Sequence, residues 1–301
     1  VNPQSVLPFS TGVIMEYLPA DKIISGLPQS LECQDAMGWE DAAKAILTTD
    51  LVSKFSSRQI SLDGHLVSIT GIAKGSGMIK PNMATMLAFV ATDANVSVEC
   101  LTDIVNYACE RTFNRITVDG DTSTNDSFML IATGDGDKNK INSILDSSFL
   151  ILRDEITAVC EELAKKIVLD GEGATKFIEI TVDGAASVEE ARKVGFSVAN
   201  SPLVKTAFFA SDPNLGRILS AVGAADVSAL DVSNVRLKIG NILVVEKGAP
   251  ALNYQESDIK SLMEADKILV NIDLARGAES ATIWTCDLSH DYVKINADYR
   301  S

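Results

Sequence analysis

The chain has 301 residues, 46% of them apolar, which is enough to build a sizeable core in one large or two ordinary domains. Its net charge of −15, from 41 acidic and 26 basic residues, argues against a nucleic-acid or anionic-membrane partner, because phosphate groups bind to basic surfaces. No apolar run reaches the about 18 residues of a membrane helix, and the first residues lack the features of a signal peptide, so we expect a cytoplasmic protein.

Helical and extended patterns alternate along the first two thirds of the chain. Periodicity predicts a helix over 39–55, and apolar, β-branched runs predict strands over 65–73 and 85–94. A helix over 98–115 leads into a strand end at 116–120. A long helical run over 141–171, broken once, ends at Gly171. A strand over 176–185 precedes a helix over 187–200, which Ser187 and Glu190 open at the spacing of a capping box.

Short strands dominate after residue 225, over 235–245, 267–275, 280–288 and 292–296. The chain shows no internal repeat and no low-complexity linker. Strands and helices are interleaved throughout, which predicts the α/β (α+β) class, with sheets covered by helices.

Few residues are available for metal or histidine chemistry. The five cysteines are scattered without metal-ligand spacing, so we expect buried, reduced thiols. With only His65 and His290, a histidine-based triad or a multi-histidine metal site is hard to build. We predict no metal and no cofactor, and an enzyme of this composition needs another base.

The stretch "KGSGMIKPNMATMLAFV" over 74–90 crowds turn residues in front of an apolar strand. Its glycines fit neither dinucleotide-binding nor P-loop spacing, and the simplest interpretation is a tight turn before a buried strand. The alternative is a nucleophile. Cleavage between Ala84 and Thr85 would free an α-amino group with a pKa of about 7.7–8.0, which can take the proton of the Thr85 hydroxyl in place of a histidine.

The polar segment "TVDGDTSTNDS" over 117–127 contains Asp119, Asp121 and Asp126. An EF-hand register fails, because the glycine and the glutamate that such a loop requires are absent. We therefore expect a hydrogen-bonded polar turn near an active site.

Residues 74–87 of this stretch, "KGSGMIKPNMATML", closely resemble the self-cleavage signature of the ornithine acetyltransferase family, the glutamate N-acetyltransferases of arginine biosynthesis. The resemblance covers essentially the whole chain. Other matching segments follow the family's order: "STGVI" (10–14), "AILTTD" (45–50), "TVDGDTSTNDS" (117–127), "DGEGATKF" (170–177), "DPNLGRI" (212–218) and "DYVKINADYRS" (291–301).

This resemblance implies a precursor that cleaves itself between Ala84 and Thr85 into chains 1–84 and 85–301, which stay folded together. It implies sheets sandwiched by helices, with chemistry like that of N-terminal nucleophile hydrolases and a topology of the family's own. Thr85 would accept acetyl from N-acetylornithine and pass it to glutamate. Two copies of each chain would form a heterotetramer, and use of acetyl-CoA as a substrate is left open.

The resemblance also implies roles for single residues. Thr11 and Gly12 match the oxyanion pair, whose loss costs roughly 3–4 kcal/mol of barrier per donor. Substrate contacts match Thr48 (or its neighbour Thr49), Lys74, Glu172, Asn296 and Ser301. Lys74 suits a substrate α-carboxylate, and Glu172 would face the substrate amine. From the residues alone, each of these has an ordinary alternative: a Ser-Thr-Gly turn, a helix surface, a solvated lysine or a loop acid.

The sequence departs from the family pattern in three places. Met15 stands where many members have glycine, Ser301 replaces the usual threonine, and the family has a sizeable segment ahead of "STGVI", so we expect an upstream segment to be missing. Two further hypotheses stay open. One is a related aminopeptidase or amidase with the same nucleophile, and the other is a non-catalytic relative that keeps the fold.

Overall fold

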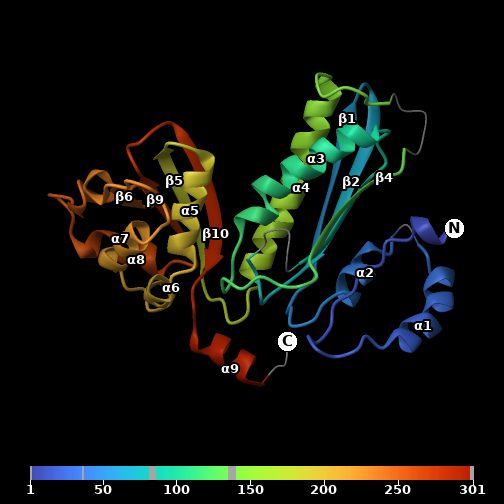
Figure 1. Ribbon diagram of the computed structural model, residues 1–301, viewed down its shortest axis with the longest axis horizontal. Helices are drawn as coiled ribbons and strands as arrows, with labels where there is room; N and C mark the ends of the chain where they lie inside the picture. Colours follow the sequence, from blue (N-terminus) through green and yellow to red (C-terminus); the bar gives the residue numbers. More distant parts are fainter. Residues whose placement is uncertain (1, 36, 81–85, 135–139, 299–301) are drawn as a thin grey trace.

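The computed structural model describes residues 2–35, 37–80, 86–134 and 140–298, which form two sheets and their covering helices (Figure 1). The first sheet has four strands in the order β1 (Lys54–Leu62), β2 (His65–Lys74), β3 (Leu87–Thr92) and β4 (Ser127–Ala132). β1, β2 and β3 pair antiparallel, whereas β3 and β4 run parallel. The predicted strands over 65–73 and 85–94 are therefore neighbours in one sheet.

The second sheet has six strands, and it is built from the last part of the chain. Their order is β10 (Glu279–Cys286), β5 (Phe177–Ala185), β9 (Lys267–Asp273), β6 (Arg236–Ile239), β7 (Ile242–Glu246) and β8 (Ala249–Pro250). β5 and β9 are parallel, and the other pairs are antiparallel.

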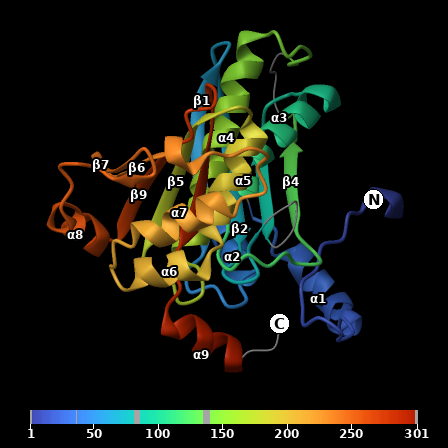
Figure 2. The same ribbon diagram turned by 60° about the vertical axis from the view of Figure 1, so that its left-hand side comes forward.

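Helices cover both sheets, as Figure 2 shows from a second side. α4 (Ser147–Leu169) packs on β1 and β2 and contacts β10, and α3 (Val98–Arg111) packs against α4. α5 (Val188–Ala199) covers β5 and β10, next to α6 (Pro202–Phe209) and α7 (Leu215–Gly223), and α8 (Glu256–Glu264) contacts β9. The remaining helices are α1 (Ala20–Glu32), α2 (Trp39–Ala45), α9 (His290–Asp298) and the short η1 (Pro3–Ser5), η2 (Phe113–Arg115) and η3 (Val232–Asn234). The predicted mixed class with helix-covered sheets is confirmed.

Each sheet has its own hydrophobic core. The first core surrounds α4, whose Leu152, Ile156 and Leu163 recur at helical spacing and are fully buried. The second core uses alternate residues of the strands, such as Ile178 and Ile180 of β5, which have the period of two expected for one face of a sheet. In the described parts of the chain, every helix is too short or too polar to span the hydrocarbon core of a bilayer.

The predicted start of α5 is correct, with one change of partner. The Ser187 hydroxyl accepts a hydrogen bond from the Glu190 N–H at 3.1 Å. The Glu190 carboxylate reaches back to the N–H of Ala186, at 3.2 Å, rather than to that of Ser187. Both bonds satisfy backbone donors that the first turn would otherwise leave unpaired.

Several predicted elements are wrong. The helical run expected over 141–171 begins only at Ser147 and is not broken, and the strand expected over 235–245 is the pair β6 and β7 with a turn at Gly240. The helix expected over 39–55 ends at Ala45, and Lys54 already belongs to β1, because its backbone pairs opposite Ala73 and its side chain is held in a buried ion network. The strand expected over 292–296 is part of α9. Local patterns did not predict α1, α6, α7, α8 and β4. Cys33 is exposed, contrary to expectation, whereas Cys100, Cys109, Cys160 and Cys286 are buried.

Candidate active site

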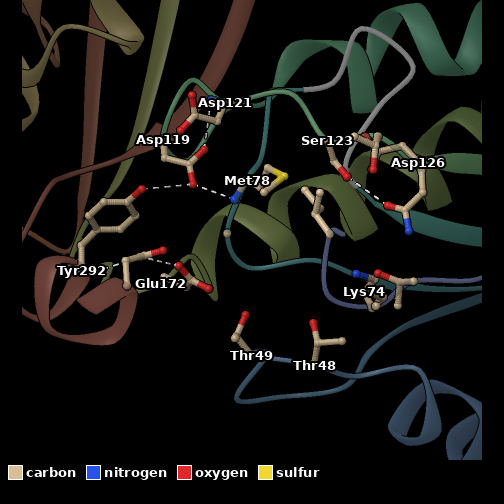
Figure 3. Close-up of a pocket in the computed structure, with 17 residues that line it drawn as sticks. Thr48, Thr49, Lys74, Met78, Asp119, Asp121, Ser123, Asp126, Glu172 and Tyr292 are labelled. Carbon is tan, nitrogen blue, oxygen red and sulfur yellow. Dashed lines mark hydrogen bonds between the residues drawn. The ribbon is translucent and has the colours of Figure 1, made fainter. Parts of the chain in front are cut away.

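A cavity of 170 Å³ lies where several distant segments meet, and Figure 3 shows the side chains that line it. The predicted residues that line it are Thr11, Gly12, Thr48, Lys74, Glu172 and Asn296. They come from the N-terminal segment, the loop after α2, the end of β2, the loop after α4, and α9. Thr49 lines the cavity as well, so both candidates for the threonine match reach it. Ala84, Thr85 and Ser301 lie outside the described residues.

The N-terminal segment is fixed to the cavity by two contacts near the predicted oxyanion pair. The side-chain amide of Asn125 donates a hydrogen bond to the carbonyl of Ser10, at 2.7 Å. The ring of Phe9 packs edge-on against Phe89 of β3, with the ring centroids 6.0 Å apart. Both contacts hold the chain directly before Thr11, which explains how a segment without a strand of its own reaches the site.

Met15, which we expect to stand where many family members have glycine, has a backbone conformation typical of glycine. Its φ is +69°, in the left-handed region that side chains other than glycine rarely adopt, and its side chain is 97% exposed. Methionine therefore forms this turn at the expense of local strain.

A buried ammonium group joins two of the loops that line the cavity. Lys54 has no exposed surface, and its Nζ lies 2.5 Å from Oδ1 of Asp50 and 2.6 Å from Oδ2 of Asp170. The third proton of this ammonium is directed to the carbonyl of Val52, at 3.2 Å. All three donors of the lysine are thus satisfied, as a buried charge requires.

The two carboxylates of this network extend it to the site. Asp50 accepts a hydrogen bond from the N–H of Gly75, at 2.7 Å, and Asp170 accepts one from the N–H of Leu51, at 3.0 Å. Burial raises the pKa of Asp50, but the hydrogen bond and charge of Lys54 outweigh it, so the net pKa is lowered. The network therefore holds the loop with Thr48 against the end of β2 and the loop after α4.

Glu172 is positioned from three sides. Its N–H donates to the carbonyl of Ser76, at 2.9 Å, and its carboxylate accepts a hydrogen bond from the Asn296 amide, at 2.8 Å. A Cβ atom on Gly77 would lie 2.4 Å from this carboxylate. Gly77 is therefore a glycine because the carboxylate occupies the space beside its Cα.

The predicted polar turn does line the cavity, and it also shapes the neighbouring loop. Asp119 accepts hydrogen bonds from the N–H groups of Met78, at 2.6 Å, and Ile79, at 3.0 Å. The hydroxyl of Tyr292, on α9, lies 3.4 Å from the same carboxylate (Figure 3). Burial and the charge of Asp119 raise the pKa of Tyr292. Asp119 and Tyr292 were not among the predicted site residues. The density of polar residues around Asp119 indicated its place near the site, whereas no local pattern indicated Tyr292.

Lys74 and Asp126 give the cavity its unusual electrostatics. Of the lining residues that the structure describes, Lys74 is the only basic one, and burial lowers its pKa against the opposing charges of Asp50 and Asp126. Burial raises the pKa of Asp126 to about 8, although the charge of Lys74 opposes the shift. Among the residues that the structure describes, Oδ2 of Asp126 is buried and has no hydrogen-bond partner, which favours the neutral acid. Within the described ranges, no three acids, cysteines or histidines are grouped as a metal site.

A family model described as the ArgJ family matches residues 1–301. The chain belongs to the ArgJ family. An arginine biosynthesis bifunctional protein ArgJ from Neisseria gonorrhoeae strain FA 1090 is 55% identical over 301 residues, which are 100% of this chain and 73% of that protein. A second one from Neisseria gonorrhoeae is 54% identical over the same lengths.

The fold agrees with a solved ArgJ structure. The crystal structure of arginine biosynthesis bifunctional protein ArgJ from Bacillus halodurans is 37% identical, with a TM-score of 0.67 over 70% of this chain and 98% of that chain. Membership of the ArgJ family confirms the predicted family and the predicted class of enzyme, an acetyltransferase. It does not favour the alternative of an aminopeptidase or amidase.

Proposed function

We propose that this chain moves the acetyl group of N-acetylornithine to glutamate through an acetyl ester on Thr85. The observation that carries the proposal is that residues predicted from distant segments, among them Thr11, Lys74 and Glu172, line one cavity. A turn, a surface lysine and a loop acid with ordinary structural roles would have no reason to meet there.

The chemistry begins with cleavage between Ala84 and Thr85. The Thr85 hydroxyl attacks the carbonyl of Ala84, the amide nitrogen is released as the amine of Thr85, and water hydrolyses the resulting ester to give chains 1–84 and 85–301. The free amine of Thr85 takes the proton of its hydroxyl, and the oxygen attacks the acetyl carbonyl carbon. Thr11 and Gly12 stabilise the negative oxygen that forms. The bond from the acetyl carbon to the ornithine nitrogen then breaks, and that nitrogen leaves with the proton. The α-amine of glutamate attacks the ester, and the Thr85 oxygen recovers its proton.

The cavity offers complementary groups for both substrates. Lys74 binds the α-carboxylate that N-acetylornithine and glutamate share. Glu172 faces the substrate amine, and Asn296, which is already hydrogen-bonded to Glu172, adds a group that can donate or accept. Thr48 and Ser301 supply hydroxyls. Binding these two substrates at one site in turn agrees with transfer by way of an acetylated enzyme.

Two finer points belong to the same proposal. The relatives are named bifunctional, which supports a second activity in which acetyl-CoA, as a substrate, acetylates glutamate. We also propose that the two chains pair with a second copy to form a cytoplasmic heterotetramer. Ornithine-free acetylation of glutamate by acetyl-CoA and the native mass test these two points separately.

The experiment is a mass measurement followed by an acceptor assay. The denatured protein should yield two masses, one from a chain that begins "TMLAFV". Ornithine release from N-acetylornithine should require glutamate and yield N-acetylglutamate. Release without glutamate would indicate a hydrolase, and an uncut, inactive chain would overturn the proposal.

The variant Thr85→Ala should stay uncut and inactive. The matched control is Thr102→Ala, because Thr102 lies on α3, where its hydroxyl bonds the carbonyl of Val98 within the same helix and no other group of the described residues. This control should be cut and active.

A further inference from the structure

A second cavity, of 450 Å³, lies at the junction of the two halves of the molecule, away from the residues of the active site. It is bordered by α3, η2, α4, α5 and β10. Three arginines line it, namely Arg111, Arg115 and Arg192, together with Ser280 and Trp284. Three guanidinium groups around one cavity are unexpected in a chain with a net charge of −15.

Arg115 is the central group, because it is buried and only partly bonded. Its exposed fraction is 9%, and its Nε donates to the carbonyl of Glu110, at 2.8 Å. This bond satisfies the carbonyl of Glu110 in the last turn of α3. It is a structural role, and it uses only the Nε donor of Arg115. The two terminal amino groups of Arg115 have no hydrogen bond to any residue in the described part of the chain.

The nearby carboxylates are committed to other partners. Glu110 is bonded by Arg192 Nη1 at 2.7 Å and by the Asn114 amide at 2.6 Å. Glu161, also at the cavity, pairs with Lys165 at 2.5 Å. Neither acid forms an ion pair with Arg115, so among the residues that the structure describes its charge has no paired carboxylate.

The electrostatics agree with this geometry. Burial and the charges of Arg192 and Arg111 lower the pKa of Arg115 to about 10, while Glu110 only partly compensates. Partly removing a charged group from water without a paired carboxylate is costly, and a guanidinium does not escape the cost by losing its proton at neutral pH. The two terminal amino groups of Arg115 are not fully buried, so they face the cavity, where an anion can reach them. A bound anion would remove that cost.

We propose that this cavity binds a phosphate-sized oxyanion, either free or as the phosphate group of a small metabolite, on the terminal amino groups of Arg115. The planar fork of a guanidinium matches two oxygens of such an anion. Arg192 lies beside it as a second cation, and the exposed hydroxyl of Ser280 stands at the rim as a further donor.

The test is binding of inorganic phosphate to the whole chain, measured by calorimetry and by thermal melting, with sodium chloride at equal ionic strength as the reference. We expect a saturable response, with the Tm raised by about 2 °C at ten times the Kd. Arg115→Gln should lose it. Arg58→Gln is the matched control, because Arg58 is already paired with Glu155 and Glu162 and lies on β1.

A second pair of variants keeps the test decisive if Arg115→Gln fails to fold. Ser280→Glu places a carboxylate at the rim without removing a buried side chain, and it should abolish the phosphate response. Ser280→Gln, of similar size and uncharged, should keep it. A response that does not saturate, or one that survives unchanged in Ser280→Glu, would overturn the proposal.

The same assay separates the two sources of the anion. If adenosine 5′-monophosphate binds at least tenfold more tightly than inorganic phosphate, and if this binding is lost in Ser280→Glu, the ligand is a phosphorylated metabolite. Equal affinity for both probes would identify the free anion.

Discussion

Gly77→Ala should damage the active site while leaving the fold nearly intact. The new Cβ would lie 2.4 Å from Cδ and Oε2 of Glu172, whereas ordinary contact begins at 3.4 Å, so the carboxylate has to move by about 1 Å. The φ of Gly77 is not positive, so alanine adds no backbone strain there. The clash involves the end of a flexible side chain, and the loss of stability should be small.

The expected loss of activity follows from that displacement. A misplacement of about 1 Å in a positioned group typically costs about 10²-fold in rate, and the hydrogen bond from Asn296 to Glu172 would also be broken. We therefore expect kcat/KM for glutamate-dependent ornithine release to fall by about 100-fold, with the Tm within about 2 °C of the parent value. Gly26→Ala, on α1 with no atom within 4 Å of the added carbon, should leave kcat/KM unchanged.

A double-mutant cycle makes the explanation testable. If Gly77→Ala acts through Glu172, its effect should largely vanish in a Glu172→Gln background, because the carboxylate it displaces is no longer there. Full additivity of the two effects, or a parent-like kcat/KM in Gly77→Ala, would show that the variant does not act by displacing the Glu172 carboxylate. A large fall in Tm would show that the loss is one of folding.

Three other predictions concern stability. Lys54→Met should lower the free energy of unfolding by about 3–5 kcal/mol in denaturant titrations, because it leaves two buried carboxylates unpaired. Arg58→Met breaks two partly exposed ion pairs, with Glu155 and Glu162, so it should lower the free energy of unfolding by only about 1 kcal/mol. Equal losses in Lys54→Met and Arg58→Met would contradict this account. Asp126, with its folded pKa raised from 3.8 to about 8, retains a proton that the unfolded chain releases, so its contribution to stability is full below 3.8 and falls as pH rises towards 8. Asp126→Asn should flatten the fall in Tm over that window, and an unchanged slope would argue against the shift. Met15→Gly should raise stability by about 0.5–1 kcal/mol in thermal melts by relieving the strain at φ +69°, whereas Met37→Gly, also exposed and without positive φ, should not.

Much of the fold follows from local patterns, and those patterns succeed where burial is one-sided. β2, β3 and β5 stand out by their apolar and β-branched residues, and α3 and α5 begin at serine caps, at Ser97 and Ser187. α6 and α7 are short and packed beside α5, so neither has room for a long amphipathic pattern. Each helix has too few turns for its apolar periodicity to be recognised in the sequence.

The candidate site was also predictable from the sequence only in part. Lys74, Glu172 and Asn296 were found through a resemblance that covers the chain, and the structure places all three at one cavity. Tyr292 was missed because "YVKIN" has the alternation of a strand, whereas the structure has a helix there. In that helix Tyr292 and Asn296 are four residues apart, on one face, and each reaches a carboxylate of the cavity. Those partners lie 173 and 124 residues away in sequence, beyond the reach of any local pattern.

The error over residues 39–55 and the failure to foresee the buried ion network have a single cause. In a helix, Lys54 would be a solvated lysine four residues after Asp50, an ordinary surface pair worth about 0.3–0.5 kcal/mol. In the structure the pair is buried because Asp170, 116 residues further on, brings a second carboxylate to the same ammonium. Asp170 also accepts the N–H groups of Leu51 and Val52, which a continuing helix would have directed to its own carbonyls. One distant carboxylate thus ends the helical pattern, starts β1 at Lys54 and holds the loop with Thr48 at the cavity, so the local structure here is a consequence of the site rather than its precondition.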